Sequence, residues 1–245
     1  KIAENGTISY QGEAINKFYI EGRDLLGGQY NLATNNLDVN AVTAVEVLEN
    51  NQHIKALKGI EFSEKTAINL KLKKGYTIRP FGEVQLGIGG DPVLYDEKIF
   101  AAYLGGKIQT MANLKVNNTG DYILDEMENK LDIGSLFSFE PLAPNFINPP
   151  TPLNVPLNSK RHLFNNTYLG SINTLIPLSK DSELTVNLSY GHDRIDQNFD
   201  LTQNIAIQDD ILKIEEQSEL KRKLSNGRLS VLYENNGLNK YIKSE

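Results

Sequence analysis

The chain has 245 residues, of which 40% are hydrophobic and 23% charged, and a formal net charge of −6, a composition that fits one or two folded domains. It contains no cysteine, which excludes disulfide frameworks, thiol nucleophiles and cysteine metal sites, and it shows no basic stripe of the kind that binds nucleic acid. Mean hydropathy is −0.37, and no apolar run approaches the roughly 20 residues that a transmembrane helix requires.

Short, changing patterns at the start of the chain predict a small α+β unit. Two alternating runs at 6–12 and 17–22, with a turn between them, indicate a hairpin. The polar, glycine-containing stretch 23–36 predicts a loop, with one helical turn at 24–26. We expect this hairpin and loop to open the unit.

The next stretch predicts a short helix around 39–42, with Asp38 or Asn40 as its cap, followed by a strand at 45–48. A turn or a short helix is expected at 52–57. These elements complete the small unit apart from its last strand.

That last strand is predicted at 67–75, where the pattern is clearest. Ile68, Leu70 and Leu72 alternate with polar residues, and two lysines and a glycine end the run. Period-two alternation predicts a strand with one buried face. We expect the chain to leave the small unit at 73–75.

After residue 75 the alternating runs are longer and predict antiparallel strands. They are expected at about 81–88, 98–104, 107–116, 164–176, 184–190, 211–223 and 229–233. Several last ten residues or more, whereas sandwich strands usually have about 5–6 residues. A transmembrane β-strand needs about 9–11 residues with alternate ones apolar, so the pattern favours a transmembrane β-barrel.

The predicted connections alternate in length. The long ones are 89–97, the proline-rich stretch 117–160, which holds a short acidic helix at 122–131, and the polar region 196–210. The short ones are 105–107, 177–182 and a hairpin turn at 225–227. Outer-membrane barrels have long external loops and short periplasmic turns, so residue 75 is expected on the periplasmic side.

Three segments resemble the plug domain of TonB-dependent outer-membrane receptors. FYIEGRD at 18–24 is similar to the family's strand that ends in an acidic residue and glycine, and NAVTAVEVLEN at 40–50 to its helix-to-strand segment. AINLKLKKG at 67–75 is similar to the strand that ends the plug. The fuller wording, including INKFYIEG, NLATNN and IKALKGIEFS, resembles the receptor-like proteins of Bacteroidetes.

The resemblance implies a plug domain at 1–75 and the first strands of an outer-membrane β-barrel at 76–245, with an external loop at about 117–160. It implies gated uptake of a nutrient ligand across the outer membrane of a Gram-negative bacterium. The implied partners are a TonB-type periplasmic energy-coupling protein, outer-membrane lipid and a surface lipoprotein lid. No cofactor is implied. Too few strands are present to close such a barrel, so a partial barrel and a fragment of a longer chain are expected.

The alternative is a soluble or surface-attached β-rich binding module without transport activity. It predicts that the apolar strand faces pack against each other in a sandwich.

No residue pattern indicates an enzyme. The three histidines, His53, His162 and His192, have no partner at metal-ligand spacing, and no nucleophile stands beside a base. We therefore predict no catalytic residue, no metal site and no cofactor.

The candidate substrate-facing residues belong to a polar segment of the first unit and to the long proline-rich loop. The alternatives are contact with the inner barrel wall for the polar segment, and packing over the barrel mouth for the loop. The candidates are Arg23, Gln29, Tyr30, Asn31, Asn35, Asn36, Phe137, Phe139 and Phe146.

Overall fold

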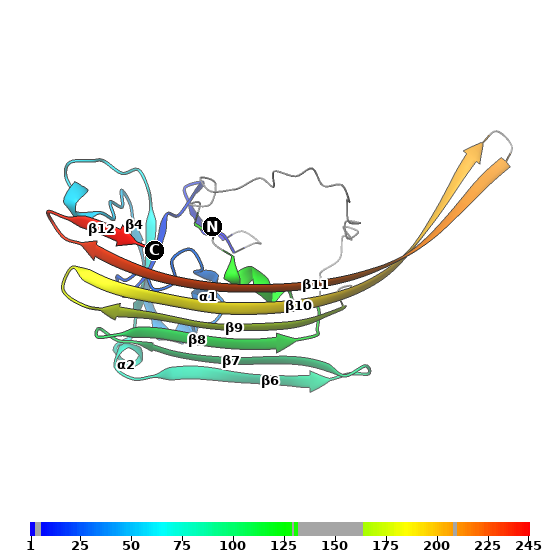
Figure 1. Ribbon diagram of the computed structural model, residues 1–245, viewed down its shortest axis with the longest axis horizontal. Helices are drawn as coiled ribbons and strands as arrows, with labels where there is room; N and C mark the ends of the chain where they lie inside the picture. Colours follow the sequence, from blue (N-terminus) through cyan, green and yellow to red (C-terminus); the bar gives the residue numbers. More distant parts are fainter. Residues whose placement is uncertain (3–5, 129, 132–163, 208–209) are drawn as a thin grey trace.

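The computed structural model describes residues 1–2, 6–128, 130–131, 164–207 and 210–245. It is mostly β-sheet with few helices. A seven-stranded antiparallel sheet, here the large sheet, runs along the molecule, and a three-stranded mixed sheet, the small sheet, stands against one end of it (Figure 1).

The small sheet has the order β3 (Lys17–Ile20), β5 (Ala67–Leu72), β4 (Val42–Leu48), with β3 parallel and β4 antiparallel to β5. Ile68, Leu70 and Leu72 are buried, as predicted. The prediction of a single buried face is wrong, because β5 is the central strand and Asn69 on its other face is buried too. The Asn69 amide pairs with Gly22 N (2.9 Å) and Glu46 Oε2 (2.6 Å), which satisfies it there.

Two local predictions for this unit are wrong. The hairpin joins β1 (Ser9–Tyr10) to β2 (Glu13–Ala14), and the predicted second strand of the hairpin, β3, pairs with β5 instead. The helical turn expected at 24–26 is found at α1 (Asn31–Thr34). In the first case, strand pairing between residues distant in sequence decides the local structure.

Two further short helices follow the predictions, whereas the predicted strand at 67–75 ends at Leu72 and a helical turn that was not predicted comes after it. Helix η1 (Val39–Ala41) is capped by the Asp38 carboxylate, which accepts from Asn40 N at 2.8 Å, and η2 (Lys55–Leu57) lies in the expected stretch. One turn of helix, α2 (Lys74–Thr77), carries the chain from β5 to the large sheet.

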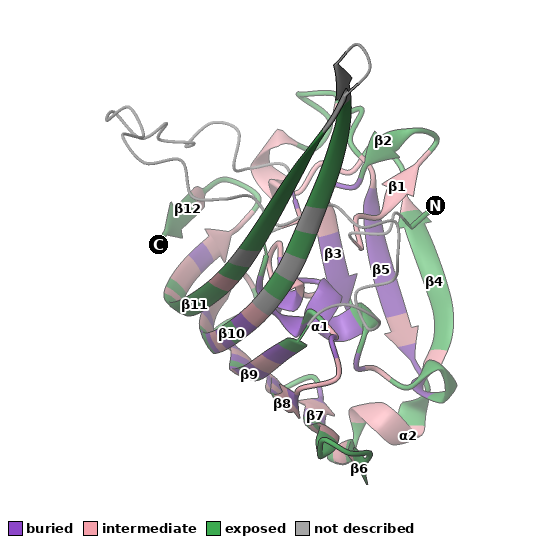
Figure 2. Cartoon of the chain, turned by 90° about the vertical axis from the view of Figure 1, so that its right-hand side faces the viewer, coloured by how far each residue is buried: buried purple, intermediate pink, exposed green. Residues whose placement is uncertain are grey.

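Within the described residues the large sheet is open, with edges β6 and β12, and does not close into a barrel. It curves around the small sheet, so that its inner face is concave (Figure 2). Its strands are β6 (Phe81–Gly89), β7 (Leu94–Leu104), β8 (Gln109–Asn117), β9 (Phe164–Pro177), β10 (Ser182–Ile207), β11 (Asp210–Asn236) and β12 (Tyr241–Ser244).

Strands β10 and β11 are far longer than predicted, with 26 and 27 residues. The region 196–210, predicted as a polar loop, continues both strands to Ile207 and Asp210. The predicted hairpin turn at 225–227 is wrong, because Asn226 lies inside β11 opposite Gly191. Beyond Asp196, β10 has lost β9 as a neighbour and pairs only with β11, which forms a ribbon projecting from the sheet (Figure 1).

The predicted alternation of loop length is also wrong. The connection after β6 spans only residues 90–93, because β7 begins at Leu94. The connections still alternate between the two ends of the large sheet. The β7–β8, β9–β10 and β11–β12 turns lie together at the end beside the small sheet, which is here called the turn end (Figure 1). The ribbon, the β6–β7 turn and the C-terminal end of β8 lie at the opposite end, here the ribbon end.

In strands β8, β9 and β10 the polarity of the large sheet is the reverse of that in a water-soluble fold, because apolar side chains are exposed on one face and polar ones are buried on the other. On the convex outer face Leu114, Ile172 and Leu188 are 48%, 54% and 49% exposed. Their sequence neighbours on the inner face, Asn113, Ser171 and Ser189, are 7%, 4% and 2% exposed. The alternation that predicted strands in these stretches therefore places apolar and polar residues of β8, β9 and β10 on opposite faces.

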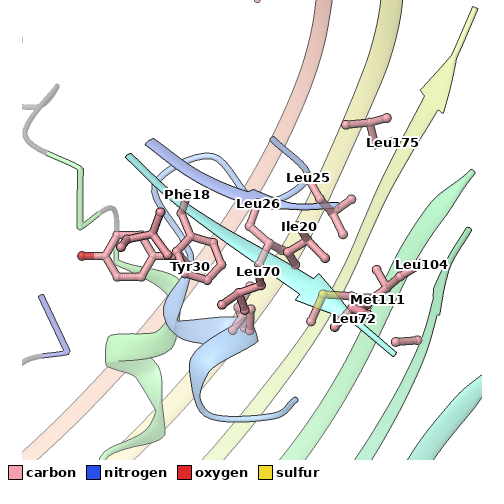
Figure 3. Close-up of a cluster of buried hydrophobic side chains, with 14 of the residues drawn as sticks. Phe18, Ile20, Leu25, Leu26, Tyr30, Leu70, Leu72, Leu104, Met111 and Leu175 are labelled. Carbon is pink, nitrogen blue, oxygen red and sulfur yellow. The ribbon is translucent and has the colours of Figure 1, made fainter. Parts of the chain in front are cut away.

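An apolar cluster joins the two sheets at the turn end. Phe18, Ile20, Leu25, Leu26, Tyr30, Leu70 and Leu72 of the first 75 residues pack with Leu104, Met111 and Leu175 of the large sheet (Figure 3). This cluster fixes the position of the small sheet on the concave face. Polar contacts between the two parts flank it.

Candidate functional site

The candidate site is the interface between residues 1–75, here the N-terminal unit, and the inner face of the large sheet. Two groups of polar contacts cross it, one at the turn end and one nearer the ribbon end. Between them Gln109 Nε2 donates to Ile20 O at 3.0 Å.

Two ion pairs and one histidine–carboxylate contact cross the interface at the turn end and are here called the seam. They are Arg23–Glu183 at 3.1 Å, His53–Glu234 at 2.7 Å and Lys55–Asp181 at 2.9 Å. Asn236 adds two hydrogen bonds, accepting from Lys55 N and donating to His53 O, both at 2.8 Å. The basic side chains Arg23, His53 and Lys55 come from the N-terminal unit, and the carboxylates come from the large sheet and its β9–β10 turn, so the seam has a consistent polarity.

His53 is held on several sides. Its Nδ1 lies 3.1 Å from the Tyr19 hydroxyl, and its ring contacts the edge of Tyr241. Burial raises the pKa of Tyr19, so this hydroxyl stays protonated at neutral pH. A cavity of about 420 Å³, lined mainly by the charged and polar residues of the seam, lies beside these groups. The three seam carboxylates in its wall each contact a basic side chain of the N-terminal unit, which indicates a structural interface.

The second group of contacts centres on η3 (Ile123–Met127), a 3-10 helix in the connection that follows β8. Its Glu126 is 3% exposed, and its carboxylate contacts donors from two parts of the molecule. Asn35 Nδ2 lies 3.0 Å from Oε1 and Asn36 Nδ2 3.4 Å from Oε2, both from the N-terminal unit. The other two donors come from β8: Asn113 Nδ2 at 3.4 Å and the Lys115 ammonium.

Apolar contacts seat η3 on the inner face. Ile123, Leu124 and Met127 form a cluster with Leu169 of β9. Gly191 of β10 lies beneath them, and a Cβ there would stand 2.5 Å from Leu124 and 2.8 Å from Met127. A glycine at this point of β10 leaves the space that η3 occupies.

The structure brings four of the predicted site residues to the η3 region or the seam. Gln29 Nε2 donates to Met127 O at 2.6 Å, and Asn35 and Asn36 contact Glu126. Arg23 contacts Glu183, so the alternative prediction, contact with the inner wall of the sheet, describes Arg23.

Tyr30 and Asn31 lie in the interior. Tyr30 is fully buried against Phe18, with ring centroids 5.3 Å apart, and its hydroxyl accepts from Ile8 N at 3.0 Å. Asn31 begins α1 and is buried as well. Neither presents surface to a ligand in this structure, and their role toward a ligand stays a prediction. Phe137, Phe139 and Phe146 lie outside the described residues.

The polar residues on the inner face of the large sheet differ in exposure. Gln109, Asn113 and Asn173 are buried, while Glu83 and Gln85 lie on the same face but are exposed, because β6 is an edge strand. The sequence analysis did not identify Glu126, His53 or Lys55 as site residues. The available signal for Glu126 was a carboxylate among apolar residues, Ile123, Leu124 and Met127, in the predicted acidic helix.

Comparison with known proteins assigns neither a family nor a further site residue to the chain. No family model and no curated protein matches the chain. In the described residues, no group of three or more histidine, aspartate or glutamate side chains is arranged to hold a metal ion. None of the helices in this part of the chain has the length and apolar character needed to cross a membrane.

Proposed function

We propose that this chain is the plug and the first barrel strands of a TonB-dependent outer-membrane transporter, which takes up a nutrient ligand through a gated barrel. The reversed polarity of the large sheet is the observation that carries the proposal. The resemblance of the segments at 18–24, 40–50 and 67–75 to plug sequences supports it independently.

Reversed polarity has a physical meaning because a sheet in water exposes its polar face, whereas a sheet in lipid exposes its apolar face. In water a sheet buries its apolar face, and exposed apolar patches larger than a few hundred Å² are rare on monomers. Here the outer face exposes Leu114, Ile172, Leu188 and Leu229, while Asn113, Asn173 and Ser189 are buried. Lipid as the outer solvent accounts for both faces at once.

The interface with the N-terminal unit suits a plug that holds and then moves. Its polar contacts, such as Arg23–Glu183 and Lys55–Asp181, lie at the rim of a cavity and can be exchanged for water. The apolar cluster around Leu26 and Met111 resists full separation. A pull by a periplasmic energy-coupling protein would therefore shift the unit along the wall, and no covalent chemistry is needed.

The partners in this proposal are lipid on the outer face, the energy-coupling protein at the turn end, and a surface lipoprotein lid at the ribbon end. The turn end is then the periplasmic side. The substrate vestibule lies toward the ribbon end, above α1 and η3.

A pair of arginine substitutions tests the proposal. Leu114→Arg and Leu229→Arg replace exposed residues on the outer face, and Ser230→Arg places the same charge on the inner face of β11 beside Leu229. If the outer face contacts lipid, each leucine variant loses about 2–4 kcal/mol and assembles poorly in the membrane. Ser230→Arg assembles like the parent protein.

Membrane fractionation and heat-modifiable migration of the full-length protein measure assembly. At positions that are 48% and 67% exposed, arginine is harmless in a water-soluble protein. Normal assembly of both leucine variants, or recovery of the protein in the aqueous phase without detergent, would contradict the proposal. That second result would favour the binding-module alternative.

A further inference from the structure

We propose that Glu126 is a positioning residue which holds the N-terminal unit against the wall of the large sheet, and that its contacts must release before the unit can move. The inference deepens the proposed function and rests on it for the meaning of that movement. The contacts themselves are independent of it.

Glu126 is the point where three parts of the molecule meet. Its carboxylate is contacted by Asn35 and Asn36 from the N-terminal unit and by Asn113 and Lys115 from β8, while η3 belongs to the connection after β8. Removal of this one side chain therefore separates contacts on both sides of the interface.

Backbone contacts make η3 a bridge rather than a surface turn. Lys130 N donates to Gly28 O at 2.8 Å, and Met127 O accepts from the Gln29 amide at 2.6 Å. Leu131, just beyond η3, belongs to the apolar cluster that joins the two sheets. The segment 122–131 is thus tied to the N-terminal unit on one side and to Leu169 and Gly191 on the other.

Charge and burial make the Glu126 contact strong and specific. The Lys115 and Glu126 side chains are 12% and 3% exposed, so their ion pair is little weakened by solvent. Loss of either charge leaves the other buried without compensation. By contrast, the neighbouring Glu128 is 60% exposed. It pairs with Lys130 of its own segment and not with a residue of the large sheet.

Because these 245 residues contain no cysteine, an introduced cysteine is the single thiol among them that maleimide can label. Ala33→Cys places a single thiol in α1, which packs against η3, and Ala67→Cys places one in β5 at the centre of the small sheet; both alanines are fully buried. These are here called the α1 thiol and the β5 thiol. The rate of maleimide labelling reports how often each site opens. The full-length protein is used in the phase, membrane or aqueous, where fractionation finds it.

We expect Glu126→Ala to raise the labelling rate of the α1 thiol by at least about tenfold, the effect of losing a hydrogen-bonded charge contact. The labelling rate of the β5 thiol stays unchanged, and the control Glu128→Gln, which keeps an acceptor for the Lys130 ammonium, alters neither rate by more than about twofold. Glu126→Gln keeps an acceptor for the asparagine amides, and its effect on the α1 thiol is expected to lie between those of alanine and the parent.

Equal labelling of the α1 thiol in the Glu126 and Glu128 variants overturns the inference. An equal rise at the β5 thiol also overturns it, because it would indicate general destabilisation. If Glu126→Ala does not fold, the comparison of Glu126→Gln with Glu128→Gln decides in its place. Recovery of the protein in the aqueous phase would refute the transporter proposal, while the labelling result would still decide the role of Glu126.

Discussion

At the scale of single residues, the structure contains a buried ion pair within the N-terminal unit. Lys17 Nζ lies 2.5 Å from Asp24 Oδ2, with side chains 16% and 10% exposed, and Asp24 Oδ1 accepts from Gly27 N at 3.0 Å. Burial lowers the pKa of Lys17, but the Asp24 carboxylate outweighs that effect and the pKa is raised overall. The pair ties β3 to the loop that leads to α1.

We predict that Lys17→Met lowers the free energy of unfolding by about 2–4 kcal/mol, because it leaves the Asp24 carboxylate buried without its cation. The pair Lys71–Glu21, 3.9 Å apart and more exposed, is the control, and Lys71→Met should cost less than about 1 kcal/mol. Denaturant unfolding of the two variants gives both values.

The raised pKa sets the pH range of this effect. A lysine whose folded pKa exceeds its unfolded value stabilises the fold fully below the unfolded pKa, and this stability is lost as pH rises through the folded pKa. The difference between the parent and Lys17→Met should therefore be constant from about pH 6 to about pH 8 and shrink only in strongly alkaline buffer. A difference that changed across neutral pH would contradict this assignment.

At the scale of elements, the strands of the large sheet, which forms the wall around the N-terminal unit, could be predicted. The residues at which these strands end could not. Strands β8 and β9 have one apolar and one polar face, so alternation assigns Leu114 and Ile172 to one side and Asn113 and Ser171 to the other. Residues 197–207 and Asp210 lie in a ribbon with polar residues such as Asn198, Asp200 and Asn204 exposed. Where water meets both faces of a ribbon, alternation carries no signal, and polar composition resembles a loop.

Pairing partners are a second limit on prediction. The parallel pairing of β3 with β5 joins residues about fifty positions apart, which no local pattern encodes. The turn signal at 225–227 is real as a dipeptide preference, but continuous pairing of β11 with β10 overrides it. Local propensity yields to the sheet whenever strand pairing continues on both sides.

The ribbon itself gives a prediction at this scale. Beyond the Asp196–Lys221 pair, β10 and β11 pair only with each other, and an isolated two-stranded ribbon is marginally stable in water. Replacement of residues 197–220 by Asn-Gly, a two-residue hairpin turn, should leave the wall intact and shift the thermal midpoint by less than about 4 °C. Thermal unfolding of the assembled protein measures this.

The matched control removes residues of the wall instead. A variant with the Asn-Gly turn placed after Leu188, before Leu229, cuts β10 where β9 pairs with it and should not assemble. If the ribbon deletion fails in the same way, the ribbon supports the wall and the prediction is wrong.

At the scale of the whole molecule, the contacts that hold the N-terminal unit against the large sheet were the least predictable part of the structure. The seam residues lie more than a hundred positions apart, as with Lys55 and Asp181. Nothing near His53 in sequence points to Glu234. What could be predicted was the type of surface: polar inner faces that seek hydrogen-bond partners from a polar N-terminal unit.

The consistent polarity of the seam allows a charge-swap prediction. Arg23→Glu places a carboxylate against Glu183, and Glu183→Arg places a second cation against Arg23. Each single variant should lower the free energy of unfolding by about 1–2 kcal/mol, because these side chains are only 31% and 25% exposed. The double swap restores an ion pair between the unit and the wall, and should recover at least half of the sum of the two losses.

The control pair lies in a single strand, where Arg194 and Asp196 are 3.0 Å apart and about half exposed. Charge reversal by Arg194→Glu should change the free energy of unfolding by less than about 0.5 kcal/mol, because this pair does not connect the N-terminal unit to the large sheet. Recovery in the Arg23/Glu183 double variant, measured by denaturant unfolding of the assembled protein, would show that the N-terminal unit is held by charge pairing across the seam. If the two losses simply add, Arg23 and Glu183 act independently, and the hold on the unit lies in the apolar cluster and Glu126.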